Sequence, residues 1–330
     1  MEQQTGSVLV VGGAGYIGSH MVYRLIEQGK DVVVIDNLST GHQEAIHEKA
    51  RFYKGDICNR EFLEQVLERE QIEYVIHFAA NSLVKESTKN PLKYYVNNLY
   101  GTIVLLEALV EHHIDKIVFS SSAATYGQPE KMPITEDMTT HPTNPYGETK
   151  LAMERLFHWV EQAHGIRYVS LRYFNACGAH ESGEIGEAHN PETHLIPLVL
   201  QVASGKREEI QIFGEDYNTK DGTCVRDYVH VCDLADAHMK AMEYLQKGNP
   251  SAIFNLGSGT GFSVKEVIEV ARKVTKQPID AVVKERRLGD PDELVAASEK
   301  AREILGWSPK YDNLEDMISS AWKWHKNPRF

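Results

Sequence analysis

The sequence predicts an α/β protein in which a doubly wound, Rossmann-like parallel sheet is joined to a smaller mixed α/β C-terminal domain. The first observation is an alternation of short, continuously apolar runs with helix-length segments, which is typical of parallel strands covered by helices on both faces. The second is a glycine-rich turn directly after the first apolar run. The third is the loss of this alternation after residue 175. Right-handed connections between parallel strands then favour a doubly wound topology.

Six predicted strands account for most of the first half of the chain. They are short runs rich in Val, Ile and aromatic residues, at 7–11, 31–35, 51–57, 74–79, 116–120 and 167–173. The segments between them have the length and pattern of helices, at 18–28, 59–70, 92–112 and 145–164. Strands that alternate with helices in this way favour a parallel sheet. We therefore expect a first domain over residues 1–177.

The second half of the chain has a less regular pattern. A polar loop follows residue 178, and the elements expected after it are helices at 195–203, 231–245 and 264–274 and strands at 210–213 and 252–255. This mixture predicts a smaller domain over residues 178–330 that binds the substrate. We also expect some of these segments to return to the first sheet.

Composition argues against several classes of protein. Of the 330 residues, 42% are hydrophobic and 25% are charged, as in ordinary globular proteins. A net charge of -12 argues against a surface that binds nucleic acid or an anionic membrane. No apolar run is long enough to span a membrane, and the polar N-terminus lacks the features of a signal peptide. The 4 cysteines include no CxxC pair and are typical of free thiols, so we expect a cytoplasmic protein.

The turn Gly12-Gly-Ala-Gly15-Tyr-Ile-Gly18 lies between the first predicted strand and the first helix. Glycines permit a tight turn there, and they let backbone N–H groups approach a pyrophosphate at the positive end of the helix. Asp36 follows the second apolar run, where a carboxylate accepts hydrogen bonds from a ribose 2′-hydroxyl and repels a 2′-phosphate. Asp56 stands at the end of the third run, in a position to contact the adenine region. These residues predict a site for NAD and not for NADP.

A second glycine cluster, Gly257-Ser-Gly259-Thr-Gly261, also follows a predicted strand. Ser263 and Glu266 after it have the spacing of a capping box for the next helix. We therefore interpret this cluster as part of a helix start and not as a second dinucleotide site.

Tyr146 and Lys150 lie about one helical turn apart in the segment Tyr-Gly-Glu-Thr-Lys. Pro145 favours the first turn of a helix, so both side chains are expected on one helical face. A free tyrosine has a pKa of about 10 and is a poor base at neutral pH, but the Lys150 ammonium and the positive ring of bound NAD would favour the tyrosinate. Ser122 follows the fifth predicted strand, at the edge where open α/β sheets bind ligands. We expect its hydroxyl to contact both the reacting oxygen of a substrate and Tyr146.

Several motifs together resemble the extended short-chain dehydrogenase/reductase family, and in particular its sugar-nucleotide epimerases. The motifs extend over nearly the whole chain, at 12–20, 36–38, 77–80, 120–123, 146–150, 171–175, 213–217, 221–228 and 255–257. The resemblance implies a Rossmann-like NAD-binding domain, a domain that binds a UDP-sugar, and a homodimer. The motifs of the second half are the more specific, because many sugar-nucleotide enzymes share those of the first half.

The resemblance also implies a role for individual residues. Ser122, Tyr146 and Lys150 are implied to be catalytic. The residues implied to hold NAD are Gly12, Gly15, Tyr16, Ile17, Gly18, Asp36, Asn37, Leu38, Asp56, Ile57, Phe78, Ala79, Ala80, Asn97, Tyr146, Lys150 and Phe174. Those implied to hold the UDP-sugar are Ser122, Tyr146, Asn175, His194, Leu195, Phe213, Arg226, Tyr228, Val264, Arg287, Asp290 and Leu294. The two arginines also suit this role on chemical grounds, because an acidic protein that binds a diphosphate needs fixed cations.

The implied reaction is the interconversion of UDP-galactose and UDP-glucose at C4 through a transient 4-keto sugar, with NAD tightly bound throughout. One alternative is another sugar-nucleotide epimerase or a decarboxylase of the same fold. A 4,6-dehydratase begins with the same oxidation but needs an additional acid and base, and Ala123 and Ala124 cannot transfer protons. A third alternative is a non-catalytic NAD-binding sensor, which has no need of Ser122, Tyr146 and Lys150 together.

Three positions differ from the family pattern. His194 replaces an Asn in the uridine loop, and Ser82 replaces a Lys that some members have near the cofactor. Leu294 replaces the Tyr or smaller residue that limits the sugar pocket, and because Leu is shorter than Tyr we expect UDP-GlcNAc and UDP-GalNAc to be admitted as well. The 15 histidines show no HExxH or paired ligand spacing, so no metal site is predicted.

Overall fold

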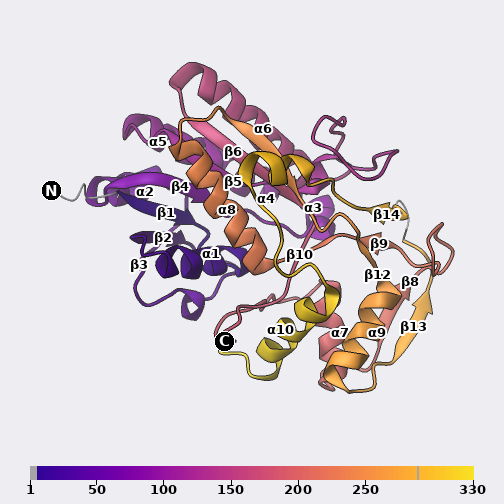
Figure 1. Cartoon of the computed structure of the whole chain (residues 1–330). Coiled ribbons are helices and arrows are strands. Elements are labelled where there is room, and N and C mark those ends of the chain that lie inside the picture. Colours follow the sequence, from indigo (N-terminus) through magenta and orange to yellow (C-terminus); the bar gives the residue numbers. More distant parts are fainter. Residues whose placement is uncertain (1–5, 288–289) are drawn as a thin grey trace.

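The computed structural model describes residues 6–287 and 290–330. Its largest feature is a parallel sheet of seven strands with helices on both faces (Figure 1). In chain order the strands are β1 Ser7–Val11, β2 Val32–Asp36, β3 Arg51–Lys54, β4 Ile72–His77, β5 Lys116–Ser120, β6 Arg167–Tyr173 and β11 Ala252–Leu256. In space they are arranged β11-β6-β5-β4-β1-β2-β3, so the strand order reverses between β1 and β4. The predicted doubly wound sheet is confirmed, and such a reversal is where sheets of this kind bind ligands.

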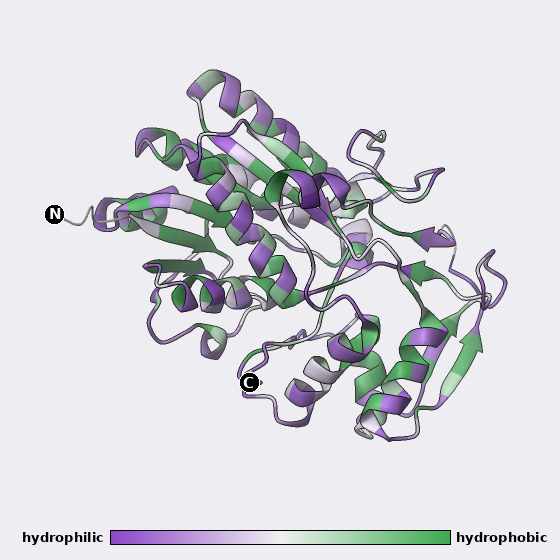
Figure 2. Cartoon of the chain, in the orientation of Figure 1, coloured by the Kyte–Doolittle hydropathy of each residue, from purple (hydrophilic) through white to green (hydrophobic). Residues whose placement is uncertain are grey.

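Alternate residues of each central strand pack against opposite layers of helices, which explains why these strands are apolar throughout. In β1, Val8 and Val10 belong to the core on the side of α1 Tyr16–Glu27 and α8 Val231–Gln246. Leu9 and Val11 belong to the core on the other side, which is formed by α2 Arg60–Arg69, α5 Gly101–Glu111 and α6 Pro145–His164. Figure 2 shows hydrophobic residues concentrated in the strands of this sheet.

The helix expected over residues 92–112 is not uniform. It consists of α4 Pro91–Tyr94, a π-helical segment η2 Tyr95–Tyr100, and α5. Asn98 in η2 is fully buried, and its amide donates hydrogen bonds to Asn81 O at 3.1 Å and to Thr149 Oγ1 at 3.0 Å. These contacts join η2 to the loop after β4 and to α6. The short α3 Val84–Lys89 was not predicted, because its polar sequence has no apolar periodicity.

Residues after β6 build a smaller unit around a hydrophobic core of its own. Its helices are α7 Leu195–Ala203, α9 Val264–Thr275 and α10 Leu314–Lys326. Its strands form small sheets: β7 Asn175–Cys177 with β10 Tyr228–His230, β8 Ile210–Phe213 with β13 Ala281–Lys284, and β9 Val225–Arg226 between β12 Phe262–Ser263 and β14 Glu293–Leu294. Most of these strands were not predicted, because runs of two or three residues have no readable period.

Two segments of the second half lie against the large sheet. β11 pairs with β6 at the edge of the sheet, and α8 packs against α1. Figure 1 shows α8, in orange, beside the indigo helix α1. The large sheet and the smaller unit are therefore connected by several crossings of the chain.

The second glycine cluster surrounds a carboxylate of the protein itself. Asp227, between β9 and β10, is buried and accepts hydrogen bonds from the backbone N and the hydroxyl of Ser258, at 2.7 and 2.6 Å. Ala296 N donates to its other oxygen at 3.0 Å. The predicted capping box of Ser263 and Glu266 is present at the start of α9 and is confirmed. The backbone N–H groups of this glycine cluster thus bind the Asp227 carboxylate of the protein itself.

Two further features bear on the expectations about membrane spans and cysteines. Within residues 6–287 and 290–330, no helix combines the length and apolar character that crossing a membrane requires. Cys58, Cys177, Cys224 and Cys232 are all free thiols.

Candidate active site

The glycine turn connects β1 to α1 at the edge where the strand order reverses. Gly12 has a φ of +84°, and a Cβ at this position would lie 2.6 Å from Ala79 N. A Cβ on Gly18 would lie 2.1 Å from Gly12 O. The protein backbone therefore requires glycine at both positions, because the start of α1 packs directly on the turn.

Gly15 differs from these two glycines. A Cβ built there would meet the protein only at Gly12 O, at 3.4 Å, and its φ of -75° is available to any residue. No contact within the chain itself therefore requires a glycine at this position. The space beside Gly15, at the N-terminus of α1, thus fits a ligand that approaches the backbone closely, as a pyrophosphate does.

Asp36 ends β2 next to this turn. Its two oxygens accept hydrogen bonds from Ala14 N at 2.9 Å and from Leu38 N at 2.8 Å, and burial raises the pKa of the carboxyl group. Asn37 donates to the Asp56 carboxylate at 3.0 Å. Each carboxylate oxygen can accept a further bond, so Asp36 remains available to ribose hydroxyls. The structure thus brings Asp36, Leu38, Asn37 and Asp56 together as the sequence predicts.

Tyr16 follows the turn and is oriented toward the second half of the chain. Its hydroxyl donates a hydrogen bond to Gly178 O at 2.6 Å, and burial raises its pKa. Ile17 is partly buried against the core that includes α8. The hydroxyl of Tyr16 therefore joins the glycine turn to the loop that follows β7.

The other residues expected to hold NAD come from four elements. Phe78, Ala79 and Ala80 follow directly after β4. Ile57 belongs to the core on the α2 side of the sheet and is only 6% exposed. Asn97 lies in η2, where its side-chain amide donates to Asn98 Oδ1 at 3.0 Å. Phe174, between β6 and β7, packs in the small hydrophobic cluster around Ala123.

The three expected catalytic residues meet where α6 begins and β5 ends. Asn144 caps α6 by accepting a hydrogen bond from Gly147 N, and Pro145 is its first residue. Lys150 Nζ donates to Ser120 O at 2.7 Å and lies 5.9 Å from the centre of the Tyr146 ring. The Ser122 hydroxyl accepts a hydrogen bond from Ala124 N at 3.1 Å and lies close enough to the Tyr146 phenol to influence its pKa. The predicted set is thus assembled at the ligand-binding edge of the sheet.

Burial dominates the acid–base properties of this set. It raises the pKa of Tyr146, and the polar Ser122 side chain beside the phenol acts in the opposite direction. Burial lowers the pKa of Lys150 to about 7, against the effect of the Glu154 carboxylate. Because burial outweighs the effect of Ser122, the protein by itself favours a neutral Tyr146 phenol. A tyrosinate at neutral pH requires further positive charge beside the ring.

Polar residues expected to bind the sugar nucleotide gather around β9 and β13. Arg226 forms an ion pair with Asp290, whose other oxygen accepts a hydrogen bond from Tyr217 at 3.1 Å. The Arg287 guanidinium lies 4.0 Å from the centre of the Phe213 ring. These contacts orient both arginines on the same unit and leave each of them further N–H donors for an anion.

Apolar residues of the expected substrate site lie in two groups. Leu195, Tyr228 and Val264 pack in or against the core of the smaller unit. Leu294 packs with Phe174 in the cluster that includes Ala123, directly after Ser122.

Asn175 is a polar residue of the expected substrate site. Its side-chain amide donates a hydrogen bond to Asp227 O at 2.8 Å.

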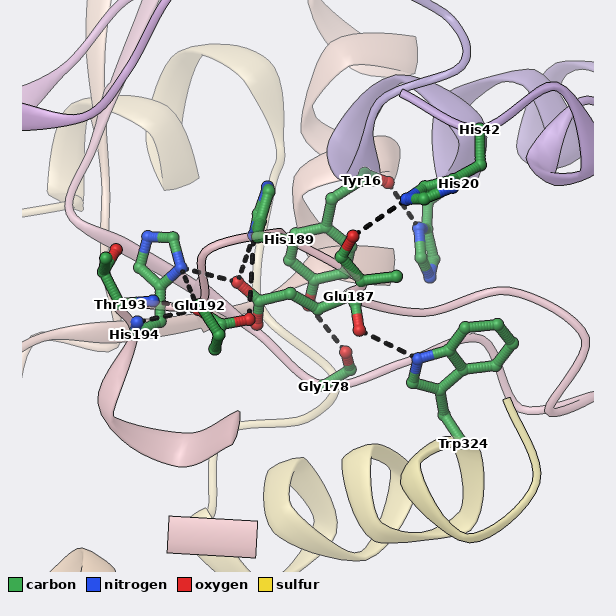
Figure 3. A network of polar contacts seen from close by, with 11 residues as sticks. Tyr16, His20, His42, Gly178, Glu187, His189, Glu192, Thr193, His194 and Trp324 are labelled. Carbon is green, nitrogen blue, oxygen red and sulfur yellow. Dashed lines mark hydrogen bonds and ion pairs between the residues drawn. The ribbon is translucent and has the colours of Figure 1, made fainter. Parts of the chain in front are cut away.

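His194 has a different environment. It belongs to a polar cluster with Glu187, His189 and Glu192, all in the loop between β7 and α7 (Figure 3). Its Nδ1 lies 2.7 Å from Glu187 Oε1 and 3.1 Å from Glu192 Oε1. Nδ1 is therefore engaged inside the chain. Sequence reasoning missed the cluster because its members are unevenly spaced, although four possible ligands in a segment of eight residues are a signal that it could have used.

The chain matches the model of the NAD dependent epimerase/dehydratase family over residues 8–257 and belongs to this family. Among its relatives, the UDP-glucose 4-epimerase of Halalkalibacterium halodurans is 59% identical over 320 residues, which cover 97% of this chain and 96% of that protein. The UDP-glucose 4-epimerase of Streptococcus mutans is 59% identical over 323 residues, which cover 97% of each.

Solved structures that resemble this chain have the same name as these relatives. A crystal structure of a UDP-glucose 4-epimerase has a TM-score of 0.97 at 56% identity and covers 98% of both chains. The UDP-glucose 4-epimerase from Brucella ovis in complex with NAD has a TM-score of 0.95 at 45% identity, covering 97% of this chain and 99% of that one. The enzyme from Bifidobacterium longum in complex with NAD+ and UDP has a TM-score of 0.92 at 41% identity, covering 98% and 99%. The Rossmann-like fold class is confirmed.

The difference between Gly15 and Gly18 gives a first prediction. Gly15→Ala is expected to leave the stability of the NAD-free protein within about 1 kcal/mol of the wild type, because the new methyl group meets no protein atom closer than 3.4 Å. The same methyl group intrudes on the ligand, so the dissociation constant for NAD is expected to rise at least about tenfold. Urea unfolding and calorimetric NAD titration measure the two effects.

Gly18→Ala is the matched variant, and it is expected to destabilise the NAD-free protein as well, because its Cβ would lie 2.1 Å from Gly12 O. Unchanged NAD affinity in Gly15→Ala would show that the cofactor does not approach this turn.

Proposed function

We propose that the protein is an NAD-dependent isomerase that interconverts UDP-galactose and UDP-glucose by inverting C4 of the sugar. The observation on which this proposal rests is the set of Ser122, Tyr146 and Lys150 at the ligand-binding edge of the sheet, next to the glycine turn. Full-length relatives with the name UDP-glucose 4-epimerase support it. Neighbours in complex with NAD and with UDP support the cofactor and the substrate class. In this proposal, residues 1–177 hold the cofactor and residues 178–330 hold the sugar nucleotide.

The residues of the site fit NAD. The turn leaves space beside Gly15 for a pyrophosphate, and Asp36 keeps acceptor capacity for ribose hydroxyls. NAD held there would supply hydride transfer at C4 of the sugar, to and from the same carbon. Asp36 favours NAD over NADP, because a 2′-phosphate would meet a carboxylate.

The chain moves the proton and positions the sugar. Tyr146 takes the proton of the 4-hydroxyl and returns it to the same oxygen when the hydroxyl is formed again. Ser122 orients both the reacting oxygen and the phenol through its hydroxyl. Lys150 remains bound to Ser120 O, with Nζ 5.9 Å from the centre of the Tyr146 ring, and its protonated form adds positive charge there. Arg226 and Arg287 hold the diphosphate while the keto sugar turns to present its other face.

One assay distinguishes this function from its alternatives. The purified protein is incubated with UDP-galactose without added NAD, and the products are separated. We expect UDP-glucose, since the cofactor stays bound through turnover. A 4-keto-6-deoxy sugar would indicate a dehydratase, and the absence of any product would indicate a non-catalytic NAD-binding protein.

Tyr146→Phe gives the second prediction. The substitution removes the proton acceptor and keeps the ring, so kcat is expected to fall by about a thousandfold. Tyr95→Phe, in the neighbouring segment η2, is the control and should leave kcat unchanged. Bound NAD should remain at the wild-type level in both variants, which separates loss of chemistry from loss of cofactor. A Tyr146→Phe variant of normal turnover would contradict the mechanism.

Leu294 bears on which sugars the site admits. Its side chain packs with Phe174 and Ala123, next to the catalytic Ser122. Leu is shorter than Tyr and has no hydroxyl, so we propose that the pocket leaves room for a 2-N-acetyl group and that UDP-GlcNAc and UDP-GalNAc are also interconverted.

The third prediction compares kcat/KM for the acetylated and unacetylated sugars. The wild type is expected to accept both, and Leu294→Tyr is expected to lower kcat/KM for UDP-GlcNAc at least about tenfold with little change for UDP-glucose. Leu294→Met keeps the volume and serves as the control. A wild-type preference for UDP-glucose above roughly a thousandfold, about 4 kcal/mol, would reject the proposal.

We further infer a cytoplasmic homodimer. Leu92, Val96, Tyr100 and Trp159 expose 75%, 56%, 51% and 68% of their surfaces on α4, η2 and α6. These elements pack against one another, which supports an apolar surface that a second copy of the chain would cover. Free thiols are typical of a reducing compartment, which supports the cytoplasm.

A further inference from the structure

The loop between β7 and α7 holds a compact cluster of two carboxylates and two imidazoles (Figure 3). Each of Glu187, His189, Glu192 and His194 offers one ligand atom, and these atoms all lie within 4.8 Å of one another. Glu187 Oε1 is 3.0 Å from His189 Nδ1 and 2.7 Å from His194 Nδ1. Glu192 Oε1 is 3.1 Å from His194 Nδ1, and its Oε2 is 3.9 Å from His189 Nδ1. Both Nδ1 atoms and both carboxylates therefore converge on one point.

These separations suit a tetrahedral metal ion. Bonds of about 2.0 Å from Zn²⁺ to nitrogen and oxygen place neighbouring ligand atoms about 3.3 Å apart. The four nitrogen–oxygen separations of 2.7 to 3.9 Å bracket that value, and all the ligand atoms lie within 4.8 Å of one another, so side-chain movements would complete the coordination. Two imidazoles among the four ligands favour Zn²⁺ over Mg²⁺ or Ca²⁺, which prefer oxygen throughout.

The two buried carboxylates of the cluster are also suited to binding a cation. The side chains of Glu187 and Glu192 are each only 6% exposed. Among the residues that the structure describes, their ion-pair partners are His189 and His194, and neither carboxylate pairs with a lysine or an arginine. In the metal-free chain Glu187 and Glu192 raise the pKa of His194 to about 10, so a protonated imidazole balances part of their charge. A divalent ion bound to the neutral imidazoles would take the place of that positive charge.

Hydrogen bonds from backbone and side-chain N–H groups hold the ligand residues in place. Glu192 Oε1 accepts hydrogen bonds from Thr193 N at 2.7 Å and from His194 N at 2.8 Å, which orients this carboxylate. Trp324 Nε1, in α10, donates to Glu187 O at 2.9 Å. Such surrounding hydrogen bonds are typical of metal sites, where they fix the ligands before the ion binds.

The cluster lies between the parts of the site that the two halves contribute. The Tyr16 ring meets the His189 ring edge-on, with ring centres 6.1 Å apart. Tyr16 directly follows the glycine turn that is expected to hold the cofactor. His194 directly precedes α7, whose first residue is Leu195. An ion here would close the loop over residues 187–194 and fix the start of α7 relative to the cofactor side.

We propose that Glu187, His189, Glu192 and His194 form a structural site for a divalent transition metal ion, with Zn²⁺ as the preferred ion. Four protein ligands close the coordination sphere, so the ion stabilises the loop and takes no part in the reaction. The proposal does not depend on the reaction that the protein catalyses.

The experiment measures metal binding directly. The full-length protein is treated with a chelator, exchanged into metal-free buffer and titrated with Zn²⁺ against a chromogenic indicator, with thermal unfolding recorded in parallel. We expect one Zn²⁺ per chain and a higher Tm in its presence. Co²⁺ in place of Zn²⁺ should give the intense visible absorption of tetrahedral coordination.

Matched variants locate the site. His189→Gln and the isosteric Glu192→Gln are each expected to raise the dissociation constant for Zn²⁺ at least about tenfold, because each removes a ligand. His158→Gln, on the surface of α6, removes a histidine outside the cluster and should bind like the wild type. Far-UV circular dichroism checks that every variant is folded. Equal Zn²⁺ affinity in all four proteins, or no saturable binding by the wild type, would assign the cluster to an ion-pair network without a metal.

Discussion

The Lys150 ammonium donates a hydrogen bond to Ser120 O at 2.7 Å, and this contact holds the first turns of α6 against the end of β5. Lys150 is 3% exposed, so its charge depends on that carbonyl and on the Glu154 carboxylate one helical turn further along α6. Glu154 in turn forms an ion pair with Arg172 of β6, at 2.5 Å, in which both side chains are 4% exposed. A line of buried charges thus fixes α6 on the sheet. Because α6 is fixed, the Tyr146 phenol lies beside the Ser122 hydroxyl.

The same burial sets the chemistry of the phenol. It raises the pKa of Tyr146, so the protein alone disfavours the tyrosinate that proton removal from a sugar hydroxyl requires. From the sequence, Lys150 and the cofactor share the task of stabilising the phenolate. In the structure the Lys150 ammonium lies 5.9 Å from the ring centre and is bound to a carbonyl. The positive charge of the bound cofactor must then lower the pKa of Tyr146 more than Lys150 does. The strength of Tyr146 as a base is thereby coupled to cofactor binding.

Sequence reasoning succeeded where local chemistry determines structure. The buried strands, the helix that begins at Pro145 and the capping box at Ser263 each follow from patterns within a few residues. It failed where distant residues meet. The bond from Asn98 to Thr149 crosses between helices, and the strands β9, β12 and β14 are too short to have a period. The ligand cluster around His194 was missed for a different reason, since its spacing matches no regular motif.

If base strength is coupled to cofactor binding in this way, Tyr146 ionises near neutral pH only when the cofactor is bound. An ultraviolet difference titration of the wild type against Tyr146→Phe isolates this one phenol from the other tyrosines. In the NAD-free protein the account predicts a pKa above the ordinary value of about 10, because burial disfavours the charged form. With NAD bound, the pKa should fall by at least about two units, since positive charge favours the tyrosinate. The same pKa with and without NAD would contradict the account.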